Sequence, residues 1–185
     1  MNPTLHSAAT QQLTDWRTDD PGQNAVRHTM LAFLAARPDA CTRACVPGHL
    51  TASALVLDHD GTHVLLTLHP RVGRWVQLGG HCEDEDGTLV EAALREAREE
   101  SGVQQLHIDP DVLHLDTHPV TCSLGVPTRH LDVRFLVRAV RGAQIVRSDE
   151  SEDLRWWPVD ALPPTAQQDT VAELVRLALA RSAAT

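Results

Sequence analysis

Apolar residues recur at three- and four-residue steps between residues 8 and 37, the spacing of an amphipathic helix. The positions that follow this spacing are Leu13, Trp16, Val26, Met30, Phe33 and Leu34. The sequence Asp19-Asp20-Pro21-Gly22 interrupts the pattern, because proline and glycine mark breaks in helices. We therefore expect two helical pieces, followed by a connector from Pro38 to Gly48.

Beyond residue 48 the pattern changes to short apolar runs bounded by turn residues, which are typical of β-strands. Strands are predicted over residues 51–57, 63–68, 75–78, 106–117 and 131–140. The first two form a hairpin around Asp58-His59-Asp60-Gly61, and the third runs into Gly79-Gly80. An acidic loop leads to Leu154-Arg155-Trp156-Trp157, and an amphipathic helix over about residues 166–180 closes the chain.

The strongest helix prediction covers Thr88 to Ser101. Thr88 and Glu91 form a capping box, in which each side chain accepts a hydrogen bond from the other residue's free backbone amide. Leu89, Ala93 and Ala97 give the apolar face, and Gly102 stands where a left-handed cap ends a helix. Strands, hairpins and one central helix together predict an α/β (α+β) fold with a mixed sheet.

Charge and composition narrow the classes of partner. The 185 residues favour one domain with a short appendage, and 16 Lys plus Arg against 25 Asp plus Glu give a net charge of −9. That balance argues against nucleic-acid polymers and anionic membranes, which bind positive surfaces. No apolar run reaches the roughly 18 residues of a membrane span. Four cysteines and no secretory leader lead us to expect a reduced, cytoplasmic protein.

The central helix carries three carboxylates on one face. At about 100° per residue, Glu96, Glu99 and Glu100 fall within an arc of about 100°. Like charges at this spacing repel each other, and hard cations such as Mg²⁺ or Mn²⁺ would turn the repulsion into binding. Arg95 is placed four residues before Glu99 and so can orient it. A solvated charged face paired with Arg95 and Arg98 is the open alternative.

The segment from Gly79 to Val103 resembles the sequence motif of the Nudix family. Gly80 matches the first glycine, and Arg95 to Val103 match the whole second half of the motif. Two departures stand out. The segment from Gly80 to Arg95 is one residue longer than the pattern, and Asp86 occupies the place of a glutamate that usually organises the loop. Asp86 or Glu85 is expected to substitute for it.

The resemblance implies a set of roles for the residues of the motif. Glu99 and Glu100 would be the principal ligands of Mg²⁺ (or Mn²⁺), helped by the backbone carbonyl of Gly79. Glu96 would be a further ligand or a base, and Arg95 would orient the glutamates. A general base could also come from a later loop, where Glu150 is the candidate, with Glu152 as its neighbour. A merely solvated acidic loop is the alternative.

The resemblance also implies the architecture. We expect a Nudix α/β/α sandwich with a mixed sheet over residues 48–185. Residues 1–47 would be an N-terminal helical extension that covers the sandwich or forms a homodimer contact.

The implied function is a metal-dependent hydrolase that cleaves the diphosphate linkage of a small nucleoside diphosphate derivative. The chain has no Tyr, which diadenosine-polyphosphate enzymes of the family typically use, and Pro119 is near the position favoured in ADP-ribose enzymes. Two alternatives stay open. One is a Nudix domain that senses a ligand without catalysis. The other is isopentenyl-diphosphate isomerase, which needs a catalytic cysteine, for which Cys82 is the candidate.

Eleven histidines are many for this chain, and several flank predicted strand ends. Cys41, Cys45 and His49 suggest zinc by their spacing, but no second compact pair accompanies them. We favour free thiols and surface histidines. His81 and Cys82 lie inside the loop of the motif, where a histidine could act as an acid or hold the loop.

Overall fold

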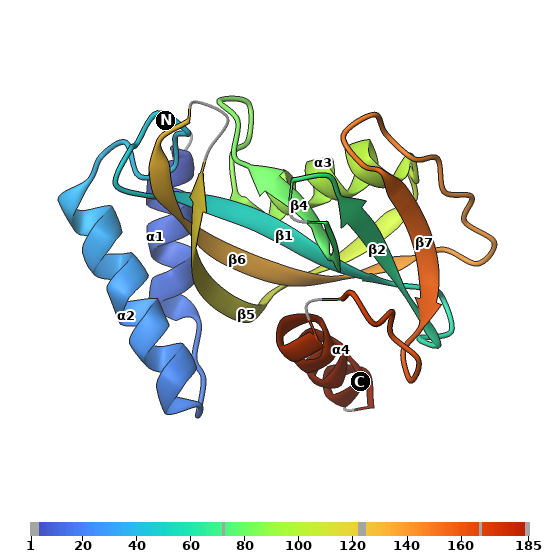
Figure 1. Cartoon of the computed structure of the whole chain (residues 1–185). Helices are drawn as coiled ribbons and strands as arrows, with labels where there is room; N and C mark the ends of the chain where they lie inside the picture. The colour runs from blue at the N-terminus through green and yellow to red at the C-terminus, as the bar shows by residue number, and fades with distance from the viewer. Residues whose placement is uncertain (1–3, 72, 122–124, 167, 184–185) are drawn as a thin grey trace.

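The structure is a computed structural model that describes residues 4–71, 73–121, 125–166 and 168–183. One mixed sheet forms its centre, with helices on both sides (Figure 1). The strands are β1 His49–Leu57, β2 His63–His69, β3 Arg74–Val76, β4 Leu78–His81, β5 Leu106–Thr121, β6 Pro127–Ala139 and β7 Asp153–Pro158. The helices are α1 Leu5–Asp15, α2 Pro21–Ala36, α3 Leu89–Ser101 and α4 Gln168–Ala183.

The strand order is β3-β2-β1-β6-β5, with β4 paired to β1 and β7 paired to β2. Only β1 and β6 run parallel among the described pairs, in a register from His49 opposite His130 to Leu57 opposite Arg138. Every residue of β1 is buried, as expected for a central strand that is covered on both faces.

The alternation of side chains along β1 separates two cores. Leu50 and Ala52 pack toward α3 on one face, whereas Leu55 and Leu57 pack on the other face beneath α4. Figure 1 shows α3 and α4 on opposite sides of the sheet. The predicted fold class, an α/β/α sandwich with a mixed sheet, is confirmed.

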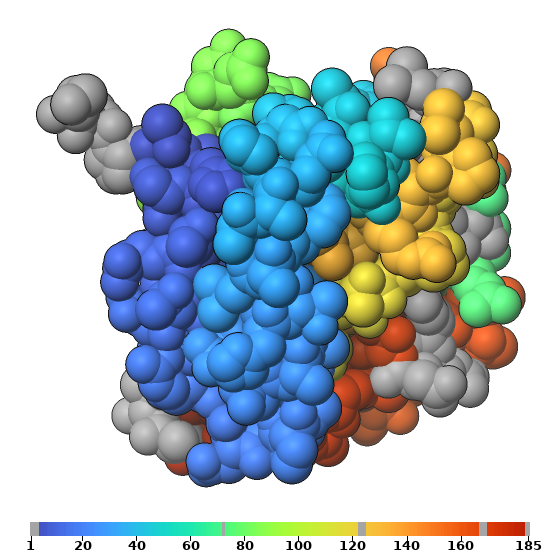
Figure 2. Space-filling model, turned by 90° about the vertical axis from the view of Figure 1, so that its left-hand side faces the viewer, coloured from blue at the N-terminus to red at the C-terminus, as the bar shows by residue number. Residues whose placement is uncertain are grey.

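The N-terminal helices pack against the sandwich. Leu13 of α1 and Met30 of α2 share one apolar core with Leu89 and Phe135. The indole N–H of Trp16 donates to the carbonyl of Val112 at 3.0 Å. Figure 2 shows α1 and α2 side by side over this end of the molecule. These helices therefore contribute to the core, while the domain division at residue 47 stays a prediction.

Two local predictions were wrong in detail. The expected third strand is two strands, because β3 pairs with β2 and β4 pairs with β1, so Gly79 and Gly80 lie inside β4. The capping box is not reciprocal. Thr88 accepts from the Glu91 amide at 3.1 Å, but the Glu91 carboxylate accepts from Gly87 at 2.8 Å.

The predicted left-handed cap at Gly102 is confirmed, with φ 70°. None of the helices described is long and apolar enough to cross a bilayer.

Candidate metal and catalytic site

Two of the three predicted glutamates are buried between α3 and β4. Glu96 and Glu100 are each only 9% exposed. They occupy this position because Ala92, Ala93 and Ala97 bring α3 close to the sheet. A Cβ atom on Gly80 would lie 2.7 Å from Oε1 of Glu96, so only glycine leaves room for that carboxylate.

Burial and mutual repulsion raise the pKa values of both carboxyl groups. The pKa of Glu96 rises to about 7, mainly through burial and against the attraction of Arg95. The pKa of Glu100 rises to about 8 through burial and the charges of Glu96 and Glu150, against a backbone hydrogen bond from Gly79. Oε2 of Glu100 is buried and has no hydrogen-bond partner among the described residues. The site is thus short of positive charge.

Arg95 connects the loop of the motif to the helix. Its Nε and Nη2 donate to the two oxygens of Asp86 at 3.1 and 2.9 Å. Nη2 also donates to the carbonyl of His81 at 2.9 Å, and Nη1 donates to Glu96 at 3.1 Å. The guanidinium therefore connects β4, the loop and α3.

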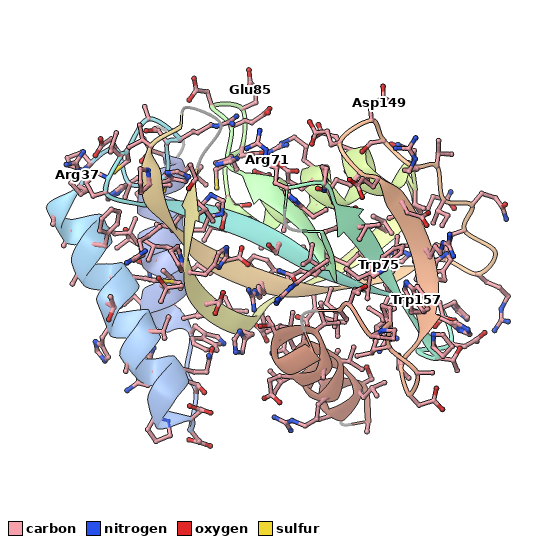
Figure 3. All side chains as sticks on the ribbon, in the orientation of Figure 1. Arg37, Arg71, Trp75, Glu85, Asp149 and Trp157 are labelled. Atoms are coloured by element: carbon pink, nitrogen blue, oxygen red, sulfur yellow. The ribbon has the colours of Figure 1, made fainter. Side chains whose placement is uncertain are left out.

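Of the two candidates, Asp86 and not Glu85 makes the contacts that organise the loop of the motif. Asp86 is 7% exposed, and its carboxylate also accepts the amide of Glu83 at 2.8 Å. Glu85 is exposed and points outward from the tip of the loop (Figure 3). The shorter side chain of Asp86 thus organises a loop that is one residue longer.

Glu99 lies apart from the buried pair. Its side chain is 59% exposed, and it accepts from Nη1 of Arg95 at 3.0 Å. Its charge contributes to the raised pKa values of Glu96 and Glu100, so it belongs to the same acidic group. The structure therefore presents two buried carboxylates with a third at the solvent edge.

The two loop candidates for a general base differ in position. Both Glu150 and Glu152 are exposed, in the loop that precedes β7. The charge of Glu150 is among the main causes that raise the pKa values of Glu96 and Glu100, whereas Glu152 is not. The outer end of this loop, at Asp149, projects beyond the sheet (Figure 3). Glu150 is thus the loop carboxylate whose charge reaches the buried pair.

The donor set fits a hard divalent cation. It offers carboxylate oxygens from Glu96, Glu99 and Glu100, of which one buried oxygen has no hydrogen bond among the described residues. The backbone of Gly80 approaches Glu96 closely because Gly80 has no side chain, and the backbone of Gly79 hydrogen-bonds to Glu100. Oxygen ligands and surplus negative charge are what Mg²⁺ and Mn²⁺ prefer.

A second polar group on the sheet was missed in the sequence. Asp132 on β6 accepts from Thr51 at 2.9 Å and from Ser53 at 2.8 Å. Its other oxygen accepts from Nε of Arg134 at 2.7 Å, and Nη2 of Arg134 donates to Asp116 at 2.8 Å. The alternation of polar residues at 130, 132 and 134 was the signal, but only pairing with β1 places them opposite Thr51 and Ser53.

Several minor predictions can be compared with the structure. Cys41, Cys45 and Cys82 are free and buried, and Cys122 lies outside the described residues. The prediction of surface histidines was wrong for His49, which is 1% exposed. Trp75 is 7% exposed and packs edge-on against Trp157 at 5.3 Å in the core under α4, with both labelled in Figure 3.

Comparison with known proteins identifies the class. A family model described as NUDIX domain matches residues 47–178. This match covers most of the chain and includes β1, the loop of the motif, α3 and most of α4. The chain belongs to the Nudix hydrolase family, and the predicted family is confirmed.

Particular relatives fall within this family. The chain is 33% identical over 135 residues to the NAD-capped RNA hydrolase NudC of Pseudomonas aeruginosa, over 71% of this chain and 45% of that protein. It therefore spans about half the length of the curated relatives it matches.

Solved structures support the fold. An Ap4A hydrolase from C. elegans has a TM-score of 0.57 at 21% identity, over 74% of this chain and 98% of that one. A UDP-X diphosphatase has a TM-score of 0.56 at 16% identity, over 92% of this chain and 88% of that one.

Proposed function

We propose that this protein is a metal-dependent hydrolase that cleaves the diphosphate linkage of a small nucleoside diphosphate derivative. The observation that carries the proposal is a pair of buried carboxylates: Glu96, which lies against Gly80 and is bonded to Arg95, and Glu100, whose Oε2 has no hydrogen-bond partner among the described residues. A structural helix gains nothing from burying Glu100 beside Glu96, since burial of a carboxylate without charge compensation is costly. A catalytic metal site requires it.

Glu96, Glu99 and Glu100, with the backbone carbonyl of Gly79, are the proposed holders of Mg²⁺ or Mn²⁺. When bound, the metal neutralises phosphoryl charge and lowers the pKa of a water molecule. Arg95 acts through the other residues, because it fixes Glu96 and Glu99 while it is tied to Asp86. It is a positioning residue.

Glu150 is the proposed general base. It is exposed, and its negative charge raises the pKa values of Glu96 and Glu100. A base on a loop can take a proton from the attacking water while the buried glutamates stay with the metal. Because Glu150 is exposed to solvent, the proton can then pass to bulk water.

The substrate class rests on the relatives. NudC is named for NAD-capped RNA, the C. elegans protein for Ap4A and another fold neighbour for UDP-X. Each is a nucleotide joined to a second group through phosphates. We propose a small nucleotide derivative for this chain, because its net charge of −9 disfavours the polymer part of a capped RNA.

The isomerase alternative is disfavoured by the state of Cys82. The thiol is 7% exposed, and burial raises its pKa far above the usual value. Its Sγ is directed at the carbonyl of Leu50, 3.8 Å away, on the core side of the loop. A thiol that must exchange a proton with substrate needs access and a lower pKa.

Product release from a panel of substrates tests the proposal. The panel contains ADP-ribose, nucleotide sugars, NAD⁺ and NADH, NAD-capped RNA, dinucleoside polyphosphates and nucleoside triphosphates. Each is assayed with Mg²⁺, with Mn²⁺ and with chelator, using wild type and Glu100→Gln. We expect metal-dependent release of a mononucleotide from a small dinucleotide or nucleotide sugar, lost in Glu100→Gln. Metal-dependent binding of a panel compound without turnover would instead support a sensing domain.

A further inference from the structure

Three histidines from neighbouring strands meet on the sheet face opposite α3. His49 on β1 pairs with His130 on β6, and His81 on β4 is opposite Thr51 of β1. Each ring offers one nitrogen, and these atoms all lie within 4.8 Å of one another. The ring centroids are 5.0 to 5.1 Å apart. We call these three residues the histidine cluster.

The histidine cluster is separate from the carboxylate site. Successive residues of a strand point to opposite faces, and Gly80 faces Glu96 on the α3 side. His81, the next residue, therefore points away from α3. Among the residues that the structure describes, the cluster includes no carboxylate, so its chemistry differs from that of the glutamates. Three imidazoles suit Zn²⁺ and other transition ions, whereas Mg²⁺ prefers oxygen.

The hydrogen bonds around the cluster resemble those around metal ligands. Nδ1 of His49 lies 3.2 Å from the carbonyl of Cys45, an acceptor that requires the proton on Nδ1 and leaves the lone pair on Nε2. Metal-binding histidines are usually oriented by such a bond to a backbone carbonyl. Nε2 of His130 is buried and has no hydrogen bond among the described residues.

Burial keeps the rings in the neutral form that binds metals. It lowers the pKa of His130 to about 4, with His118, His49 and Arg43 adding to the effect. Arg43 also opposes a bound cation, but it is exposed and so screened by water. The negative charge of Asp132, in contrast, raises the pKa of His130.

We propose that His49, His81 and His130 bind one Zn²⁺ ion and leave a fourth position open. Tetrahedral coordination at about 2.0 to 2.1 Å places ligand nitrogens about 3.4 Å apart. The nitrogens already lie within 4.8 Å, so small ring rotations suffice. The site does not depend on the proposed hydrolase activity, because it uses none of the carboxylates.

Zinc binding to the full chain tests the proposal. Metal-stripped protein is titrated with ZnCl₂ in saturating Mg²⁺, which competes for the carboxylates, and bound zinc is measured by elemental analysis and calorimetry. We expect one equivalent. His81→Gln and His130→Gln are each expected to weaken binding by at least about 100-fold, since even loss of a residue behind a ligand costs roughly 10- to 100-fold. Arg43→Gln is expected to tighten it.

Matched variants exclude other zinc sites. His107→Gln removes an exposed histidine outside the cluster, Glu100→Gln removes a carboxylate ligand, and Cys41→Ser with Cys45→Ser removes two thiols; all should keep full affinity. If a cluster variant fails to fold, the absorption spectrum of Co²⁺-loaded wild type replaces it. In that spectrum, d–d bands without a thiolate charge-transfer band indicate histidine ligation. The proposal is overturned if wild type binds no zinc under Mg²⁺, or if binding follows the thiols or Glu100 instead.

Discussion

The guanidinium of Arg95 lies against the carboxylate of Asp86 in a two-bond arrangement, with Nε–Oδ1 at 3.1 Å and Nη2–Oδ2 at 2.9 Å. Asp86 has a side-chain exposure of 5% and Arg95 one of 19%, so water screens this pair little. Two parallel bonds fix orientation as well as distance. Through this pair the loop after β4 determines where Glu96 and Glu99 lie.

Arg95→Lys keeps the charge but loses the two-bond geometry. We expect a decrease in the free energy of unfolding of about 2 kcal/mol, the scale of losing hydrogen bonds between charged groups. We also expect a larger fall in kcat than in substrate affinity. Denaturation with urea and steady-state kinetics measure both. Asp86→Asn should lower the free energy of unfolding and kcat in the same way. Glu85→Gln, at the exposed loop tip, should match wild type in both. Equal damage from Glu85→Gln would contradict the role of Asp86.

Gly80→Ala places a methyl group where Glu96 now lies. The added Cβ would be 2.7 Å from Oε1 and 2.8 Å from Oε2, so the carboxylate must move out of the site. We predict at least about a 100-fold loss of kcat, as for removal of a charge-stabilising group, with the fold retained by circular dichroism. Gly87→Ala is the control, because its Cβ meets only the exposed end of Glu91. Full activity in Gly80→Ala would argue against a role for Glu96.

Glu150→Gln and Glu152→Gln separate a base from a solvated acidic loop. If Glu150 takes the proton of water, its amide variant should lose at least about 100-fold in kcat, the usual contribution of general base catalysis. Glu152→Gln should stay within about twofold of wild type, because Glu152 is not among the main charges that act on Glu96 and Glu100. Single-turnover kinetics with saturating Mg²⁺ measure the chemical step. Indistinguishable rates for the two variants would assign the base elsewhere.

The raised pKa values predict how the metal-free protein responds to pH. Glu96 and Glu100 bind protons more tightly when folded, with pKa values of about 7 and about 8 against 4.5 for the ordinary group. Their contribution to stability is thus fully present below pH 4.5 and is lost as pH rises through about 8. Without metal, stability should fall over this window.

Thermal unfolding between pH 5 and 9 with chelator measures that loss. Mg²⁺ should restore stability most at the alkaline end, where the carboxylates are ionised. At pH 8 Glu100→Gln should stabilise the metal-free protein by about 2 kcal/mol, since each pKa unit corresponds to about 1.4 kcal/mol and the pair shares its charge. A metal-free stability that rises toward pH 8 would contradict the buried pair.

The parts of the site that follow from helical periodicity could be predicted from the sequence. Glu96 and Glu100 are four residues apart, so a helix places them on one face whatever surrounds it. Their burial could not be predicted, because it depends on the approach of β4 through Gly79 and Gly80, which were expected to end a strand. Glu99 lies within the same arc of the helix, yet its side chain stays exposed.

Contacts between residues that are far apart in the chain could not be predicted from the sequence. Asp132 accepts from Thr51 and Ser53 about 80 positions away, and only the parallel register of β1 and β6 joins them. The histidine cluster has the same origin, since three strands must pair before the rings meet. Neither group has a local spacing that a motif could capture.

We propose above all that Glu96 and Glu100 hold a divalent metal ion that the reaction requires. The most direct test measures Mn²⁺ binding by electron paramagnetic resonance and turnover of the best panel substrate on the same samples of wild type and Glu100→Gln. We expect activity to follow bound Mn²⁺ in wild type, and Glu100→Gln to lose both Mn²⁺ binding and activity while keeping its fold. Turnover in Glu100→Gln at the wild-type rate, or in wild type with chelator, would contradict it.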